Sequence, residues 1–295
     1  MPSSYVGEIS ALLVSVCWAI SSSSFEKSCR RVGSLSVNYI RLFLAFIMLG
    51  IIGLFSHGSF FPTGAEKQQW IWLSVSGLLG FFMGDLLSFK SLSLIGSRLS
   101  MLVMTFSPVI TALISFFILN ERLRFYQILA ILLITFGILM AFIGFEKNQV
   151  KFRISLKGFL FALGGALGQS LGLIFSKKGI GHYDPFAATQ IRIITGFLAF
   201  SVLILFLKRT PSVKKTLKDA VSMKFITIGS FFGPGLGVAL SLFAVTKTET
   251  GVASTLMALP PILLIIPALI KGKPVAKREL IGAFISVGGV IILFL

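Results

Sequence analysis

The sequence predicts an all-α, polytopic membrane protein with ten transmembrane helices arranged as two inverted five-helix repeats. Three observations lead to this prediction. Of the 295 residues, 55% are hydrophobic and only 13% are charged, and the mean hydropathy is +0.95. The apolar residues form runs of about 20 residues, the length that crosses a bilayer as a helix. Residues spaced 150 to 153 positions apart recur in the same order in the two halves of the chain.

The composition argues against a soluble protein, because a soluble domain of this length needs more polar surface to face water. The net charge of +17 could suggest nucleic acid. The basic residues, however, lie in short gaps between apolar runs, and none of these gaps can fold into a binding domain. We therefore expect no nucleic-acid partner, and we interpret the charge as loop charge that contacts anionic lipid headgroups. Cys17 and Cys29 make neither a disulfide framework nor a zinc site, so we expect no metal and no cofactor.

Ten apolar runs follow one another with brief connections. The first run is not expected to be a cleaved signal peptide, because it lacks a basic start and no small-x-small cleavage site follows it. The longest connections, 56–69 and 208–224, are too short for an extramembrane domain. Function must therefore reside within the bilayer. The predicted spans are Val6–Phe25, Ser36–Phe55, Trp70–Leu92, Leu99–Leu119, Phe125–Phe145, Leu156–Phe175, Phe186–Leu207, Phe225–Val245, Val252–Ile270 and Glu279–Leu295.

Lys and Arg residues are distributed unevenly between the two sides. In and beside the odd-numbered loops they number 19, against 6 for the even-numbered loops. Because basic loops remain in the cytoplasm, the bias favours cytoplasmic odd-numbered loops and external termini.

The two halves share a collinear set of residues, which indicates an internal repeat. We assign residues 1–147 to the first repeat and 148–295 to the second. Five spans per half is an odd number, so the halves must cross the membrane in opposite senses. The matched pairs are Phe25 with Phe175, Lys27 with Lys177, Arg41 with Arg192, Gly80 with Gly233, Gly84 with Gly237, Ser88 with Ser241, and Pro108 with Pro261.

An inverted-topology repeat is a common architecture of secondary transporters, since two similar halves can exchange roles and open a central site to either side. A duplication that serves only stability is the alternative.

Further residues extend the pattern. Leu119-Asn120-Glu121-Arg122-Leu123 follows Pro108, and Gly288-Gly289-Val290 lies in the last span. This pattern resembles the EamA-like branch of the drug/metabolite transporter superfamily over nearly the whole chain. The resemblance implies ten helices, a cavity lined by helices 1, 3, 4, 6, 8 and 9, and termini inside, opposite to the charge bias. The second half departs from it at Lys273-Pro274-Val275.

Asp85 is an acid placed well inside a predicted span, where a charge costs several kcal/mol and marks a candidate functional site. Arg41 lies at a matching depth, roughly 9 Å from the same side at 1.5 Å per residue. The two can therefore meet, either as a coupling or substrate-binding pair or as a structural ion pair. In the second half Val238 replaces Asp85, so Arg192 is expected to face an interface or an anionic group.

Several other residues at depth are candidates for the cavity. Pro108 and Pro261 occupy matching positions in the two halves, where kinked helices can mark gates, although a kink without a transport role is equally open. Gly168-Gln169-Ser170-Leu171-Gly172 reads G-x-S-x-G, but it lies in a helix without an intramembrane His, so we expect no enzyme. The predicted substrate-binding residues are Trp18, Ser22, Phe82, Thr105, Gln169, Ser170 and Thr255.

The sequence thus predicts a secondary transporter that moves a small organic metabolite, such as an amino acid or drug, by alternating access. The expected location is the cell (plasma or inner) membrane. Expected partners are the substrate, membrane lipid and protons, with the chain as a monomer or homodimer. A non-transporting scaffold, or an accessory or lipid-binding subunit, is the alternative, and a polar central cavity would distinguish the two.

Overall fold

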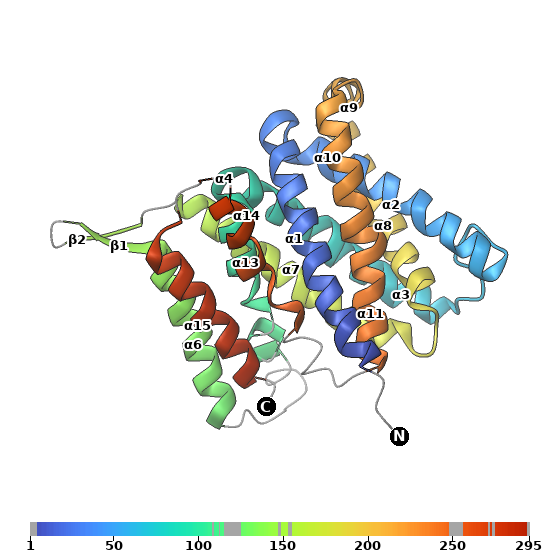
Figure 1. Ribbon diagram of the computed structural model, residues 1–295. Helices are drawn as coiled ribbons and strands as arrows, with labels where there is room; N and C mark the ends of the chain where they lie inside the picture. Colours follow the sequence, from blue (N-terminus) through green and yellow to red (C-terminus); the bar gives the residue numbers. More distant parts are fainter. Residues whose placement is uncertain are drawn as a thin grey trace.

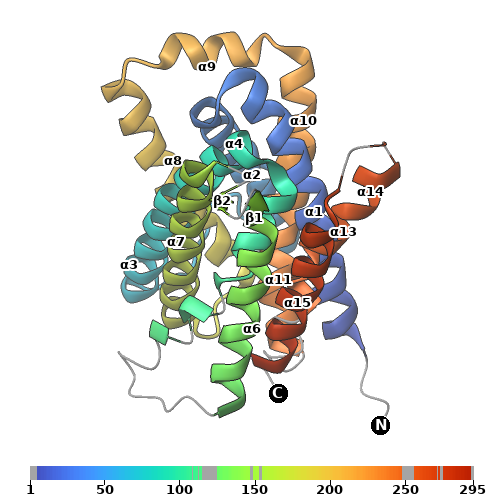
Figure 2. The ribbon, with the colours of Figure 1, turned by 90° about the vertical axis from the view of Figure 1, so that its left-hand side faces the viewer.

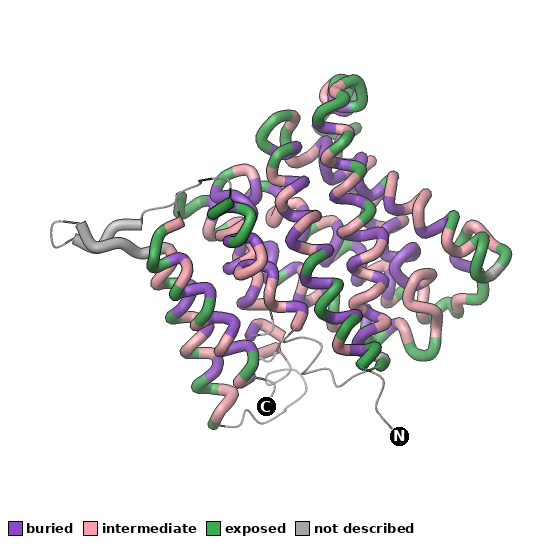
Figure 3. Tube along the Cα trace, viewed as in Figure 1, coloured by how far each residue is buried: buried purple, intermediate pink, exposed green. Residues whose placement is uncertain are grey.

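The computed structural model describes residues 5–107, 109–111, 113–114, 125–146, 149–152, 155–247, 256–270, 272 and 275–293. The molecule is a bundle of helices (Figure 1). The first helix begins and the last helix ends at the same end of the bundle, and the connection through α9 (Thr210–Leu217) lies at the other end. Large apolar side chains such as Phe55, Phe206 and Ile270 are exposed on the outside of the bundle, and exposed positions recur along the outer helices (Figure 3).

Within the described residues, six helices are long and apolar enough to cross a membrane, and two shorter apolar helical segments accompany them. A surface covered with exposed apolar side chains is what lipid requires and what water disfavours. The prediction of an all-α, polytopic membrane fold is confirmed.

In the first repeat, glycines set the points at which helices end. Gly33, with φ of 87°, separates the first two helices, and Gly96, with φ of 81°, interrupts the third at the break predicted between Leu92 and Leu99. A positive φ costs glycine little, so the chain can turn there. The elements are α1 (Val6–Val32), α2 (Ser34–His57), α3 (Lys67–Ser76), the π-helix η1 (Gly77–Gly84), α4 (Asp85–Met104) and α6 (Phe125–Phe142).

In the second repeat, side chains cap the helix starts. Ser155, Asp184 and Asp219 each accept a hydrogen bond from a backbone N–H of the first turn that follows. These caps satisfy N–H groups that a helix start leaves free. The elements are α7 (Leu156–Ile180), α8 (Pro185–Phe206), α9 (Thr210–Leu217), α10 (Ala220–Ser230), the π-helix η2 (Phe231–Gly237), α11 (Val238–Lys247), α13 (Pro260–Leu263), α14 (Ile265–Ile270) and α15 (Lys277–Leu293).

Three sequence expectations need correction. The helix predicted to end at Phe145 ends at Phe142, and strands β1 (Ile143–Glu146) and β2 (Gln149–Phe152) form an antiparallel hairpin between the repeats. The described part of the predicted span Val252–Ile270 contains α13 and α14 rather than one helix, since its prolines lack the N–H that a helix interior needs. The loop 208–224 contains α9, which lies across the end of the bundle (Figure 2).

Helices of one repeat pack against helices of the other in a symmetric pattern. Helix α1 packs against α10, η2 and α11, while α7 packs against α3, η1 and α4. These two groups exchange when the repeats are interchanged. Helix α2 packs against α8, and α6 packs against α15. In each of these pairs the two helices occupy equivalent positions in the two repeats, so interchanging the repeats leaves the pair unchanged. This pattern is what two inverted five-helix repeats produce, so the repeat architecture inferred from the sequence is confirmed.

Candidate functional site

Gly80 and Gly84 of η1 lie against Gly168 and Gly172 of α7, and we call these four residues the glycine seam. A Cβ added at Gly168 would overlap the backbone of Gly84, and one at Gly172 would lie 2.8 Å from the Gly80 Cα. Ser76 Oγ donates a hydrogen bond to the Gly172 carbonyl across the seam. Two backbones can approach this closely only without side chains between them.

The equivalent contact in the other group is built differently. Here η2 lies against α1, with Gly233 facing Ser21 and Gly237 facing the ring of Trp18. Ser21 Oγ donates to the Gly229 carbonyl at 2.9 Å. Both π-helices thus occupy matching positions in the repeats, as the pairs Gly80 with Gly233 and Gly84 with Gly237 predict. Such wide turns occur frequently at functional sites.

Asp85 lies directly after η1 and is the centre of a group that we call the charged cluster (Arg41, Asp85, Gln169, Arg192), in which the three charged side chains are buried and Gln169 is partly buried. Arg41 of α2 forms an ion pair with Asp85 Oδ2, as their matching depths suggested. Gln169 Nε2 of α7 donates to Asp85 Oδ1 at 2.8 Å. Both carboxylate oxygens are therefore occupied, one by each repeat.

Arg192 of α8 completes the cluster. Its guanidinium lies 4.9 Å from the centre of the Phe81 ring, whose other cationic neighbour, Arg41, lies at 5.9 Å. The Phe81 ring therefore supplies a favourable cation–π contact to each of the two arginines. Arg192 Nε has no hydrogen-bond partner among the described residues.

The structure places the other predicted residues in separate surroundings. Ser170 Oγ donates a hydrogen bond to the carbonyl of Ser107, which connects α7 to the residues that follow α4. Ser22 and Thr105 donate to carbonyls three residues earlier in the chain. Phe82 packs edge-on against Phe200. Trp18 packs against an apolar group that includes Ala11 and Val14 of α1 and Ala244 of α11. Pro261 is buried in α13. Thr255 and Pro108 lie outside the described residues, so the place of Thr255 in the cavity and the matched proline pair Pro108–Pro261 stay predictions.

Asn38 is a member of the site that the sequence analysis missed. Its Nδ2 donates to the Asp85 carbonyl at 3.2 Å, and its Oδ1 accepts from Arg41 Nε at 2.9 Å. Asn38 precedes Arg41 by three residues, so the two share one helix face. That spacing, next to a charge at depth, is the signal that could have revealed it.

Comparisons with known proteins identify the family. The profile of the EamA-like transporter family matches the chain twice, over residues 5–143 and 156–295. The chain belongs to the EamA-like transporter family. It is 22% identical over 269 residues to the uncharacterized transporter YetK of Bacillus subtilis (strain 168), covering 88% of this chain and 81% of that protein. It is 27% identical over 188 residues to an uncharacterized transporter of Clostridium kluyveri, covering 63% and 60%.

A solved crystal structure shares the fold of this EamA-like chain. It superposes with a TM-score of 0.61 at 16% identity and covers 97% of this chain and 95% of its own. At that identity the likeness supports the fold alone. Family membership points to a membrane transporter and not to an enzyme. Among the described residues no group of His, Cys, Asp or Glu could hold a metal ion.

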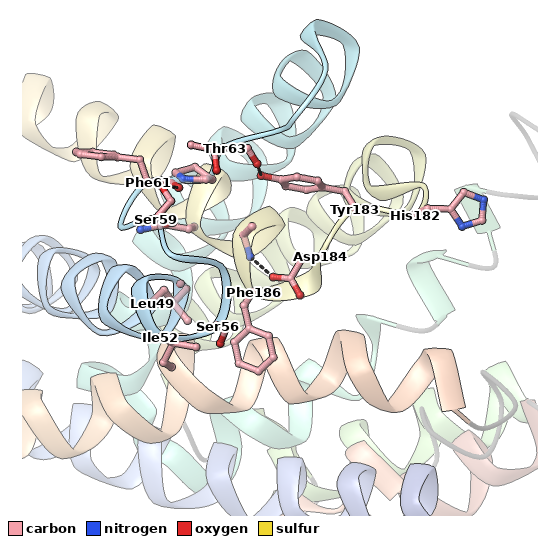
Figure 4. Close-up of a pocket in the computed structure, with 14 residues that line it drawn as sticks. Leu49, Ile52, Ser56, Ser59, Phe61, Thr63, His182, Tyr183, Asp184 and Phe186 are labelled. Carbon is pink, nitrogen blue, oxygen red and sulfur yellow. Dashed lines mark hydrogen bonds between the residues drawn. The ribbon is translucent and has the colours of Figure 1, made fainter.

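A pocket of about 520 Å³ lies away from the charged cluster, between the end of α2, the loop after it and the start of α8 (Figure 4). Three of its polar side chains already have partners. Asp184 accepts from Ala187 N, Tyr183 Oη donates to the Thr63 carbonyl, and Gln190 Nε2 donates to the Phe60 carbonyl. We therefore interpret it as a space left between packed loops.

Ion pairs connect the two repeats of the EamA-like fold at the end opposite the termini. Arg31 Nε of α1 lies 2.7 Å from Asp219 Oδ2, just before α10. Arg98 of α4 and Glu279 of α15 lie 3.2 Å apart. Within the first repeat, Glu26 accepts from the Ser97 backbone and hydroxyl beside the Gly96 break. These contacts hold the odd-numbered loops together.

Asp219 both caps α10 and pairs with Arg31, so we expect Asp219→Ala to lower the melting temperature more than Asp219→Asn, which can still cap. The hydrogen bond from Ser222 N and the pairing with Arg31 hold the pKa of Asp219 below its ordinary value of 3.8. Its contribution is therefore present above pH 3.8 and lost as the pH falls through the lower folded value. Melting curves against pH should show wild type and Asp219→Asn converging in acid.

The matched control for this prediction is Asp184→Asn. Asp184 caps α8 through Ala187 N in the same way, but it forms no ion pair with another described residue. Its amide should cap equally well, so the melting temperature should stay at the wild-type value. Equal melting of Asp219→Asn and wild type at neutral pH would show that the ion pair contributes nothing measurable.

Proposed function

We propose that the protein is a secondary transporter that moves a small organic metabolite across the cell membrane by alternating access. One observation carries this proposal. The charged cluster draws Arg41 and Asp85 from the first repeat and Gln169 and Arg192 from the second, and it lies buried beside the glycine seam. Buried charges inside a bilayer are expensive and typically mark substrate or ion pathways.

The packing of the two repeats supports a rocking motion. The seam between η1 and α7 has no side chains to interlock, so the helices can slide or rock along it. The matching contact between η2 and α1 has Trp18 and Ser21 in place of glycines, so the two contacts can favour different states. Opening at the odd-numbered loops requires the Arg31–Asp219 and Arg98–Glu279 pairs to separate.

A solute or proton gradient is the proposed energy source, with Asp85 as the candidate coupling group and Arg41 as its partner. Uptake by proteoliposomes of a panel of labelled metabolites, with and without a pH gradient, tests the function. We expect saturable uptake of at least one compound above that of empty vesicles. Absence of uptake and efflux for the whole panel would favour a membrane scaffold or an accessory subunit instead.

Gln169 provides a specific test. Gln169→Leu removes the hydrogen bond to Asp85 Oδ1 while keeping a similar volume. A hydrogen bond to a charged group contributes about 1.5–3 kcal/mol, so the initial transport rate should fall about tenfold or more. Rates are to be normalised to folded protein measured by size-exclusion chromatography.

The matched control is Gln68→Leu, because Gln68 is exposed on α3 and distant from the cluster. That variant should transport at the wild-type rate. Undiminished transport by folded Gln169→Leu would remove the polar residues of α7 from the site.

A further inference from the structure

Arg192 is a buried cation with an unused hydrogen-bond donor. Its side chain lies in the middle of α8 and is only 5% exposed. Arg192 Nε has no partner among the described residues, although an unpaired buried donor is costly. The guanidinium lies over the Phe81 ring, and this cation–π contact does not provide a hydrogen-bond acceptor for the Arg192 Nε–H group. The described part of the chain therefore supplies no acceptor for this N–H group.

The charges of the cluster do not balance. Two guanidinium groups face one carboxylate, and Arg41 and Gln169 already occupy the two oxygens of that carboxylate. Within the residues that the structure describes, one buried positive charge is thus left without a carboxylate of its own. A buried charge without compensation is strongly destabilising, so its presence calls for an anion from outside the fold.

The repeat symmetry shows which position of the second repeat lacks a carboxylate. Asp85 follows η1 and pairs with Arg41, and in the second repeat Val238 follows η2 at the matching position. Arg192 matches Arg41 but has Val238 where Arg41 has Asp85. The first half thus contains both members of an ion pair, and the second half contains only the cation.

We propose that Arg192 binds an oxyanion group of the transported compound, so that the substrate is a small organic anion that carries a carboxylate or phosphate. The guanidinium offers parallel N–H donors that match either group. Gln169 and Gly80 border the site, since Arg192 Nη2 lies 3.5 Å and Gln169 Oε1 4.0 Å from the position of the missing Gly80 Cβ. This inference rests on the proposed transport function and narrows its substrate class.

The first test measures binding to purified protein by thermal unfolding in detergent. The probes are benzoate, butyrate and inorganic phosphate, with benzamide and butyramide as neutral counterparts. We expect at least one anion to raise the melting temperature and the amides to have no effect. The responding anion distinguishes a carboxylate site from a phosphate site. Arg192→Gln should lower anion affinity about 10- to 100-fold, in line with the loss of a charged hydrogen bond.

The melting temperature without any probe separates this role from a structural one. If Arg192 awaits a ligand, Arg192→Gln removes an uncompensated charge and should melt at or above the wild-type temperature. A structural arginine predicts the opposite. Arg192→Lys keeps the charge and should retain part of the response. No response of wild type to any anion, an equal response of Arg192→Gln, or strong destabilisation by Arg192→Gln would each overturn the proposal.

The second test compares uptake of the same acids and amides in proteoliposomes, and it separates the two proposals. Preferential uptake of acids supports the anion site. Equal uptake of acids and amides would leave transport standing and overturn the anion site. Stabilisation by acids without any uptake or efflux would leave the anion site standing and count against transport.

Discussion

Asp85→Asn is expected to cause a large loss of folded protein. The substitution removes the only negative charge described in the cluster and leaves both Arg41 and Arg192 buried beside a neutral side chain. Breaking a buried ion pair on one side costs about 3–5 kcal/mol in soluble proteins, a large fraction of the stability of a typical domain. Yield of monodisperse protein by size-exclusion chromatography and the melting temperature measure the effect.

The double replacement Arg41→Leu with Asp85→Leu is the matched rescue. It removes one positive and one negative charge, so the cluster keeps the wild-type net charge. Folding should recover, because apolar residues can replace a buried ion pair with little loss of stability. If Asp85 also couples protons, the double variant should fold but fail to accumulate substrate in response to a pH gradient. If the ion pair is only structural, transport should return with folding.

One outcome would contradict both roles of Asp85. If the Asp85→Asn protein folds like wild type and still accumulates substrate with a pH gradient, folding does not need the ion pair and coupling does not need a proton on Asp85. Asp85 would then be a polar residue without an assigned role. A variant that folds but loses only the pH dependence would support coupling over structure.

Gly168→Val is the second change with a large expected effect. A Cβ at this position overlaps the backbone of Gly84, and Leu79 O lies 2.9 Å from it. Backbone atoms cannot move aside as a flexible side chain can, so the glycine seam must open. Overpacking costs about 1–3 kcal/mol in well-packed cores and more where helices must separate. Folded yield and melting temperature should fall sharply.

Substitutions of two other glycines serve as comparisons for the effect of Gly168→Val on folding. Gly288 in α15 has no described atom within 4 Å of its missing Cβ, so Gly288→Ala should leave folding unchanged. Gly164 faces the end of the Leu87 side chain, which can rotate away, so Gly164→Ala should have an intermediate effect. Normal folding of Gly168→Val would show that the two helices are not packed as closely as described.

Apolar runs predicted most of the helices, because every backbone polar group within lipid must be satisfied inside its own segment. This constraint ties length and hydropathy directly to structure, so Leu156 and Phe125 begin helices where predicted. Where the constraint weakens, prediction failed. The apolar run Phe125–Phe145 is followed by polar residues, and its last three residues belong to strand β1, which pairs with β2, rather than to the end of the helix.

The sequence by itself determined the membrane class, the inverted repeat and the pairing of Arg41 with Asp85, since depth in a helix follows from counting residues. Only the tertiary structure decided which partners surround that pair. The contacts of Asp85 with Gln169, and the proximity of Arg192 through Phe81, join helices far apart in the chain. These residues meet because the glycine seam lets α7 pack closely against η1. Counting residues along one helix gives the depth of a side chain but not which other helix packs against it.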